Sequence, residues 1–291
     1  MRKAYTQLHL AVLLAGLTGI LGRLITLNEL MIVCYRMLLT VLSMWVLFAW
    51  RKKIESLSTL TIAKIMAVGM IASLHWLTFY GAIKYANVSI ALVCFAAIGF
   101  FTALFEPLIL RRSLNWRELL LGLLTLTGVY IIFHFDTRYT VGIVIGLVSA
   151  LLASLFPIFN RELLKKTNVE SMLVWQQLGG FLLMVVLIPV YRQALPATRL
   201  LPTLEDFLWL LVLSWVCSVW AFQLSASALK KLSAFTVNLS YNLEPVYGII
   251  LAFVFFREDQ LLSSSFFWGL GLILLALGLH AAMVFSKKNR S

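Results

Sequence analysis

One half of this 291-residue chain can be laid over the other half. At an offset of 146 residues, the stretch 82–84 (Ala-Ile-Lys) meets 228–230 (Ala-Leu-Lys), and Arg111 meets Arg257. Each half contains five long apolar runs. Because five is an odd number, the second half must cross a membrane in the opposite orientation to the first. Inverted repeats of this kind are typical of secondary transporters.

The composition requires a lipid environment. Hydrophobic residues make up 62% of the chain and charged residues 12%, and the mean hydropathy is +0.95. Soluble proteins are about half apolar and about a quarter charged. One crossing of a bilayer takes roughly 20 apolar residues. We therefore expect ten spans, at 7–26, 29–50, 62–84, 88–110, 115–135, 139–160, 170–191, 206–229, 233–256 and 265–286.

These runs predict an all-α membrane protein with ten transmembrane helices in two inverted five-helix repeats. The first repeat is expected to cover residues 1–137 (helices 1–5) and the second residues 138–291 (helices 6–10). Arg2 and Lys3 are also typical of the start of a signal peptide, but the first run continues without a small-x-small cleavage site. We therefore expect this run to be a retained helix.

The distribution of basic residues predicts the orientation. With ten spans, both termini share one face with four of the connections, and most of the 24 Lys and Arg residues fall on this face. Short loops rich in Lys and Arg stay in the cytoplasm. We therefore expect a multi-pass protein of the cell inner (cytoplasmic) membrane with both termini cytoplasmic. Topology accounts for the net charge of +12, so nucleic acid is not an expected partner.

A charged residue inside a span costs a few kcal/mol and usually faces a cavity or a partner, and three such residues stand out. Arg36 is in the second span and Glu244 in the ninth, at depths that place them within reach of each other. They are interpreted either as a charge pair that lines a substrate path or as a structural pair between two helices. Glu106 is near the end of the fourth span, and a structural pairing with Arg111 or Arg112 is favoured.

Uncharged polar and aromatic residues occur at similar depth in several spans, and this convergence favours a substrate site. Together with Arg36 and Glu244, the candidate substrate-binding residues are His75, Trp76, Tyr80, Gln176, Trp220, Gln223, Tyr241 and Asn242. Each of them is equally well explained as a hydrogen-bonding contact between helices. For His75, a fixed hydrogen-bond partner is favoured over a proton carrier.

Helix-weakening residues occur at corresponding positions of the two halves. Pro245 follows Glu244 and removes a hydrogen bond from the helix, and its equivalent in the first half is Gly99. Matched interruptions point to a binding site near the middle of the membrane. Gly99 and Pro245 are therefore predicted hinges.

The chain resembles the EamA-type members of the drug/metabolite transporter superfamily over nearly its whole length. The most specific stretch runs from Leu-Glu-Pro-Val at 243–246 to Phe-Arg-Glu at 256–258, followed by Gly271 and Gly278. The first half departs from the family pattern, since it has Ala-Ile-Gly at 97–99 without the usual proline and Arg112 where Glu is common. The resemblance implies efflux or exchange of small metabolites, often amino acids, by alternating access.

A secondary transporter of a small organic solute is therefore the leading hypothesis, with Arg36 holding a carboxylate and Glu244 an amine. The alternatives are a transporter of phosphorylated or nucleotide-linked substrates, an intramembrane transferase and a non-transporting membrane scaffold. Enzymatic activity is not expected, because no cluster suited to catalysis is present. The cysteines have no metal-binding spacing, and no cofactor is expected. The expected partners are a small-molecule substrate and the lipid bilayer, with the monomer and the homodimer both open.

Overall fold

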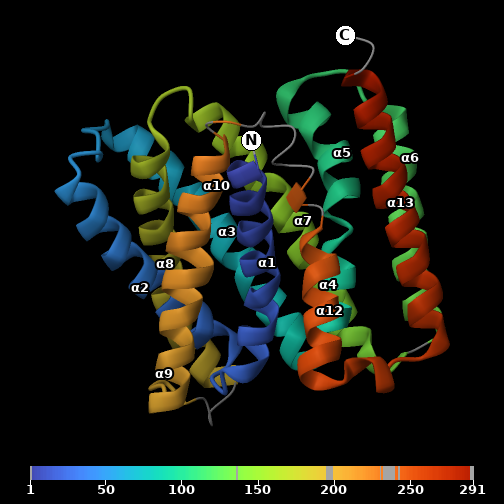
Figure 1. Cartoon of the computed structure of the whole chain (residues 1–291). Helices are drawn as coiled ribbons and strands as arrows, with labels where there is room; N and C mark the ends of the chain where they lie inside the picture. Colours follow the sequence, from blue (N-terminus) through green and yellow to red (C-terminus); the bar gives the residue numbers. More distant parts are fainter. Residues whose placement is uncertain are drawn as a thin grey trace.

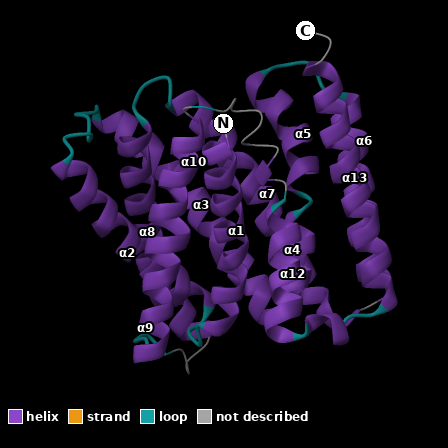
Figure 2. Cartoon of the chain, in the orientation of Figure 1, coloured by secondary structure: helices purple, strands orange, loops and turns teal. Residues whose placement is uncertain are grey.

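The computed structural model describes residues 2–135, 137–194, 199–229, 231, 240–241 and 243–288, which form a helical bundle (Figures 1 and 2). The α-helices are α1 (Arg2–Leu24), α2 (Glu29–Trp50), α3 (Thr59–Tyr85), α4 (Val88–Phe95), α5 (Ile98–Leu110), α6 (Trp116–Phe135), α7 (Thr140–Leu163), α8 (Val169–Ala194), α9 (Leu204–Leu211), α10 (Ala221–Leu229), α12 (Glu244–Phe256) and α13 (Ser264–Lys288). The π-helix η2 (Val212–Trp220) joins α9 to α10, and the short 3-10 helices are η1 (Thr137–Tyr139) and η3 (Glu258–Gln260). No strand occurs among the described residues, so the predicted all-α class is confirmed.

Most predicted spans correspond to one observed helix or to a few consecutive ones. Within the described residues, nine helical stretches are long and apolar enough to cross a membrane, counting α4 with α5 and α9 with η2 and α10. The predicted span 233–256 corresponds to the shorter helix α12, and its residues 233–239 lie outside the described part of the chain. The count of ten spans and the inversion of the two halves stay predictions.

The bundle has two ends that are used below as reference points. The terminal end is the end at which α1 begins and α13 finishes, and the connections after α2, α5 and α7 lie at the same end (Figure 1). The distal end carries the connections after α1, α3 and α12 (Figure 1). The start of α1 and the end of α13 therefore lie at the same end of the bundle. An even number of membrane crossings would produce this arrangement. Which side of a membrane this is stays a prediction.

Glycines allow helices of the two halves to approach closely. A Cβ atom added to Gly16 of α1 would lie 3.0 Å from the backbone nitrogen of Gly248 in α12. A Cβ atom added to Gly146 of α7 would lie 2.8 Å from the Cβ of Cys94 in α4. Larger side chains at these positions would push the helices apart.

Helices α6 and α13 pack against each other at the edge of the bundle (Figure 1). Their backbones approach at Gly128 and Gly269, where an added Cβ on either glycine would lie 2.6 Å or less from the carbonyl oxygen of the other. The last helix of the first predicted repeat thus has the last helix of the second repeat as its neighbour.

The two predicted hinges lie beside breaks in the helices. The span 88–110 is interrupted at Ala96 and Ala97, which separate α4 from α5, and Gly99 follows two residues later. Pro245 was expected to interrupt a continuous helix. In the described residues it does not. Helix α12 begins at Glu244, and Pro245 occupies its first turn, where the missing N–H has no intrahelical partner to lose. Their roles as hinges stay predictions.

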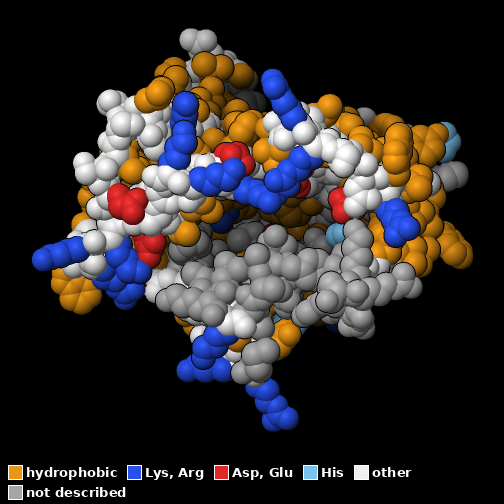
Figure 3. All heavy atoms as spheres, turned by 90° about the horizontal axis from the view of Figure 1, so that it is seen from above, with side chains coloured by type: hydrophobic (Ala, Val, Ile, Leu, Met, Phe, Trp, Pro, Cys, Tyr) orange, Lys and Arg blue, Asp and Glu red, His pale blue; other side chains and the backbone are white. Residues whose placement is uncertain are grey.

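The terminal end carries many Lys and Arg side chains, which line the rim of a hollow in Figure 3. Glu106 lies here and pairs with Arg161 of α7 at 3.0 Å and with Arg112 at 3.8 Å. The favoured structural pairing of Glu106 with Arg112 is thereby confirmed, and Arg161 is an additional partner. Lys53 and Glu170 form a further ion pair between the connection after α2 and the start of α8.

Candidate functional site

Arg36 is buried within the bundle and is the centre of a polar cluster. Helix α2 carries it two turns beyond the N-cap Asn28, whose side chain accepts a hydrogen bond from the backbone of Met31. The guanidinium Nη1 donates to the hydroxyl of Tyr80 at 2.7 Å, and its carbon lies 4.1 Å from the ring centre of Trp76. Three predicted site residues, one from α2 and two from α3, therefore come together.

The π-helix η2 supplies the opposite wall of this cluster. The Nε of Arg36 donates to the hydroxyl of Ser218 at 3.3 Å, and the hydroxyl of Ser214 donates to the backbone carbonyl of Arg36 at 3.3 Å. Ser218 also donates to the carbonyl of Leu213, five residues earlier, as the wider turn of a π-helix allows. Sequence reasoning missed both serines. Their spacing of four residues within an apolar run was the available signal.

The predicted residues that follow these serines are not part of the cluster. Trp220 ends η2 with 47% of its surface exposed, and Gln223 is half-buried in α10. No hydrogen bond or ring contact joins either of them to Arg36 in the described structure. In this segment, Arg36 is hydrogen-bonded to Ser214 and Ser218 and not to the predicted residues Trp220 and Gln223.

Among the described residues, Arg36 has no acidic partner at contact distance. No carboxylate of the described residues lies within 4.0 Å of its guanidinium nitrogens. Glu244 is half-buried at the start of α12 and interacts with the charge of Arg36 over a longer distance. The two residues are therefore not a closed structural pair. The two residues carry opposite charges, to which a solute with two charges of opposite sign would be complementary.

His75 lies in a contact between α3 and α7 and not in the Arg36 cluster. Its Nδ1 is 2.9 Å from the hydroxyl and 3.1 Å from the carbonyl oxygen of Ser149, and the Ser149 hydroxyl donates to the backbone carbonyl of His75. The imidazole also stacks on Phe95 with ring centres 5.4 Å apart. These contacts agree with the favoured interpretation of His75 as a fixed hydrogen-bond partner.

Gln176 is likewise used in helix packing. Its side-chain amide donates to the Oδ1 of Asn160 in α7, and its backbone lies directly against Gly69 of α3. The residue is buried where α3, α7 and α8 meet. The structure therefore places Gln176 away from the Arg36 cluster, although Gln176 and Arg36 lie at similar depths in their predicted membrane spans.

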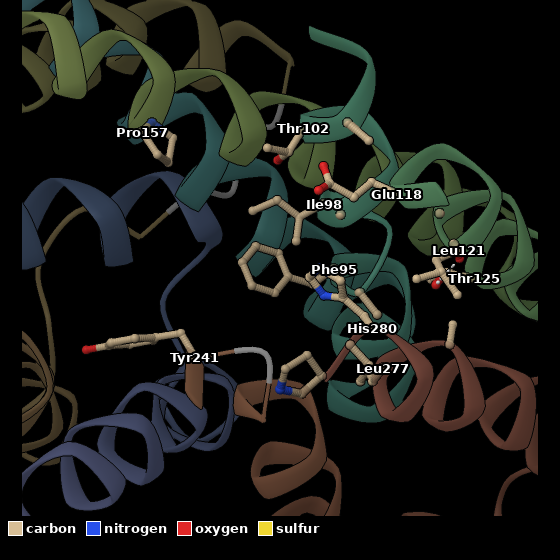
Figure 4. A pocket seen from close by; sticks show the side chains of 16 residues that line it. Phe95, Ile98, Thr102, Glu118, Leu121, Thr125, Pro157, Tyr241, Leu277 and His280 are labelled. Atoms are coloured by element: carbon tan, nitrogen blue, oxygen red, sulfur yellow. Dashed lines mark hydrogen bonds between the residues drawn. The ribbon is translucent and has the colours of Figure 1, made fainter. Parts of the chain in front are cut away.

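A cavity of about 440 Å³ lies between α5, α6, α7, α12 and α13, towards the terminal end (Figure 4). Both predicted hinges, Gly99 and Pro245, line it, and so does Pro157, which lies inside α7. Cavities of this size hold small organic ligands. Helix-weakening residues of three different helices therefore line the same cavity. One of them, Pro245, directly follows Glu244 in the sequence.

The cavity is mostly apolar, with ionisable groups that sequence reasoning missed. Glu118 comes from the first turn of α6 and accepts a hydrogen bond from the Asn115 amide at 2.6 Å, and His280 comes from α13. The signal for His280 was an ionisable residue inside the last apolar run. Tyr241 also lines the cavity, but its hydroxyl points away from the other labelled side chains (Figure 4) and lies 2.5 Å from that of Ser225. The last predicted site residue, Asn242, lies outside the described residues.

These features define a multi-pass α-helical membrane protein with a buried polar cluster and a ligand-sized cavity. The class follows from nine membrane-length apolar helices in the described residues. The chain belongs to the EamA-like transporter family, whose model matches residues 2–134 and 140–282. The family resemblance inferred from the sequence motifs is thereby confirmed.

Two individual proteins are similar to the chain. A Haemophilus influenzae (strain ATCC 51907 / DSM 11121 / KW20 / Rd) protein named "Uncharacterized transporter" is 26% identical over 161 residues, which are 52% of this chain. The match spans about half of that relative, 53% of its length. A protein of known crystal structure has a TM-score of 0.64 and 13% identity, with 97% of this chain and 98% of that chain covered. At this identity, the likeness concerns the fold alone.

Proposed function

We propose that the chain is a secondary transporter that exports or exchanges a small organic metabolite across the cytoplasmic membrane by alternating access. Amino acids are the first substrate class to test. The observation that carries the proposal is the buried Arg36, which has no carboxylate within 4.0 Å among the described residues. A charge within a membrane bundle costs several kcal/mol unless a partner neutralises it. A substrate carboxylate would be this partner.

The cluster around Arg36 is suited to this role. A guanidinium has five N–H donors, and the side chains of Tyr80 and Ser218 each engage one of its nitrogens. Donors therefore remain for a carboxylate, while the ring of Trp76 holds the plane of the guanidinium from one face. Glu244 supplies the complementary charge for an ammonium group. This division of charges supports a zwitterionic solute over a phosphorylated one, which would need several cations.

The first experiment is a thermal-shift screen of the purified protein against amino acids, nucleobases and aromatic metabolites. The ligand with the largest stabilisation is then used in proteoliposome counterflow with the wild-type protein and Arg36→Ala. We expect amino acids to stabilise the wild type and Arg36→Ala to insert normally but to transport nothing. Normal transport by Arg36→Ala would show that the substrate site is elsewhere.

A matched control tests whether the loss is specific to the site. Arg199→Ala removes a cation at the distal end that pairs with Asp206, outside the Arg36 cluster. Its retained transport would show that loss of one arginine does not by itself inactivate the protein.

A further inference from the structure

A buried carboxylate joins three helices at the distal end. Glu258 has no exposed side-chain surface, and its oxygens accept hydrogen bonds from the backbone of Val88 at 3.1 Å and of Ser89 at 2.8 Å. The hydroxyl of Ser89 donates to it at 2.6 Å, and Arg23 forms an ion pair with it. We call these four residues the Glu258 cluster.

The Glu258 cluster connects the second half of the chain to the first. Glu258 begins η3 directly after α12, Val88 and Ser89 are the first residues of α4, and Arg23 is in the last turn of α1. A carboxylate is favourable at the start of a helix, where N–H groups have no intrahelical acceptors. The Glu258 carboxylate is shielded from solvent. If α1 and α4 moved away from η3, this buried charge would lose its hydrogen-bond donors.

The corresponding position of the first half has the opposite charge. The offset of 146 residues places Arg112 at the position of Glu258. The two preceding residues, Arg111 and Arg257, both have left-handed backbones, with φ of 52° and 54°. The two connections therefore share a backbone turn. An arginine, however, cannot accept hydrogen bonds from backbone N–H groups.

The ion pair that Arg112 forms with a described residue is exposed and lies at the terminal end. Its side chain is 53% exposed and lies 3.8 Å from Glu106, which is itself 37% exposed. Exposed ion pairs contribute little to the stability of a contact. The cavity lined by Glu118 and His280 lies towards this same end. The end with the buried carboxylate is thus closed, and the end with Arg112 is the one that the cavity approaches.

We propose that the Glu258 cluster is a contact that closes the distal end of the transporter, and that Arg112 supplies no buried carboxylate at the corresponding position of the terminal end. The resting protein is therefore biased towards opening at its terminal end. Release or uptake of substrate at the distal end requires Glu258 to separate from α1 and α4. This assignment rests on the proposed alternating-access function and adds the residue that controls access on one side.

The test measures the opening of each end by electron–electron distance measurements between nitroxide labels in lipid nanodiscs. Leu201→Cys and Leu261→Cys label exposed positions at the distal end, and Ser56→Cys and Ser113→Cys label exposed positions at the terminal end. The native cysteines are buried, so labelling is directed to the introduced ones. Each pair is measured with and without Glu258→Gln.

We expect Glu258→Gln to raise the ratio of long to short distal distances at least tenfold, which corresponds to about 1.4 kcal/mol. The terminal pair should shift to shorter distances in the same sample. Ser89→Ala removes one hydrogen bond without changing a charge and should produce a smaller shift in the same direction. Glu106→Gln is the matched control, because it removes an exposed carboxylate at the other end, and the distal pair should not respond to it.

Unchanged distances in both Glu258→Gln and Ser89→Ala would overturn the proposal. Broadening at both ends, without shortening of the terminal pair, would also overturn it, since this would show a purely structural role. The measurement needs no substrate, so its outcome is independent of the transport assay. Distances that behave as expected in a protein that transports nothing would contradict the proposed function and leave the closing contact in place.

Discussion

Replacing Arg36 by methionine separates a substrate-binding role from a structural one. Methionine keeps an unbranched apolar chain, although a shorter one, and removes the charge and its contacts with Tyr80, Ser218 and Trp76. Hydrogen bonds to charged groups contribute about 1.5–3 kcal/mol each, and a desolvated cation–π contact contributes about 2 kcal/mol. The change therefore removes roughly 5–8 kcal/mol of favourable contacts.

The same change also removes the cost of burying a cation that has no acidic partner. This cost is several kcal/mol per ion, so the two effects nearly cancel. We expect the free energy of unfolding to change by no more than about 2 kcal/mol. At about 2–4 °C per kcal/mol for domains of 150–250 residues, the melting temperature should move by less than about 8 °C. Transport should nevertheless be lost.

The measurement combines thermal unfolding, followed by tryptophan fluorescence in detergent, with counterflow in proteoliposomes. Arg36→Lys is the matched variant, because it keeps the charge but loses the planar guanidinium that lies over Trp76. We expect it to fold and to bind the substrate more weakly than the wild type. The reasoning is wrong if Arg36→Met melts far below the wild type while its folded fraction transports normally.

Three further substitutions test other parts of the structure. Gly16→Val should lower the free energy of unfolding by about 1–3 kcal/mol, as overpacking does, because its Cβ would lie 3.0 Å from the backbone nitrogen of Gly248; an unchanged melting curve would contradict the close packing of α1 on α12. His75→Ala should lower the melting temperature by removing the contact with Ser149, whereas the folded protein should keep its apparent affinity for substrate in counterflow, and a selective loss of affinity would place His75 in the site. Glu244→Gln should reduce transport of amino acids more than transport of monocarboxylates without an amine, and an equal effect on both would exclude an ammonium-binding role.

The fold was largely predictable because it depends on patterns within single segments. Apolar runs of membrane length indicated the helices, and the offset between Arg111 and Arg257 indicated two related halves with a shared connection. The left-handed backbone of both arginines agrees with that alignment. Boundaries were less predictable, since Ala96 and Ala97 divide one apolar run into two helices without a proline.

The site was predictable only in part, because its geometry depends on residues that are distant in sequence. Arg36 stood out as a cation in an apolar run, and Trp76 and Tyr80 were near it in depth. Depth does not specify the direction of a side chain, so His75, only one residue from Trp76, was grouped with them but faces α7. The π-helical turn that brings Ser218 to Arg36 has no clear sequence signal.

The pairing of α6 with α13 limits how such a chain can have arisen. The glycine face of α6 at Gly128 is covered by α13 at Gly269, which belongs to the other predicted repeat. A polypeptide of five helices would leave this face uncovered. If the halves descend from one gene and are inverted as predicted, the ancestral product would have buried this face by associating with a second copy inserted upside down. On that prediction, fusion of the two genes would have made permanent a partnership that had previously depended on encounter within the membrane.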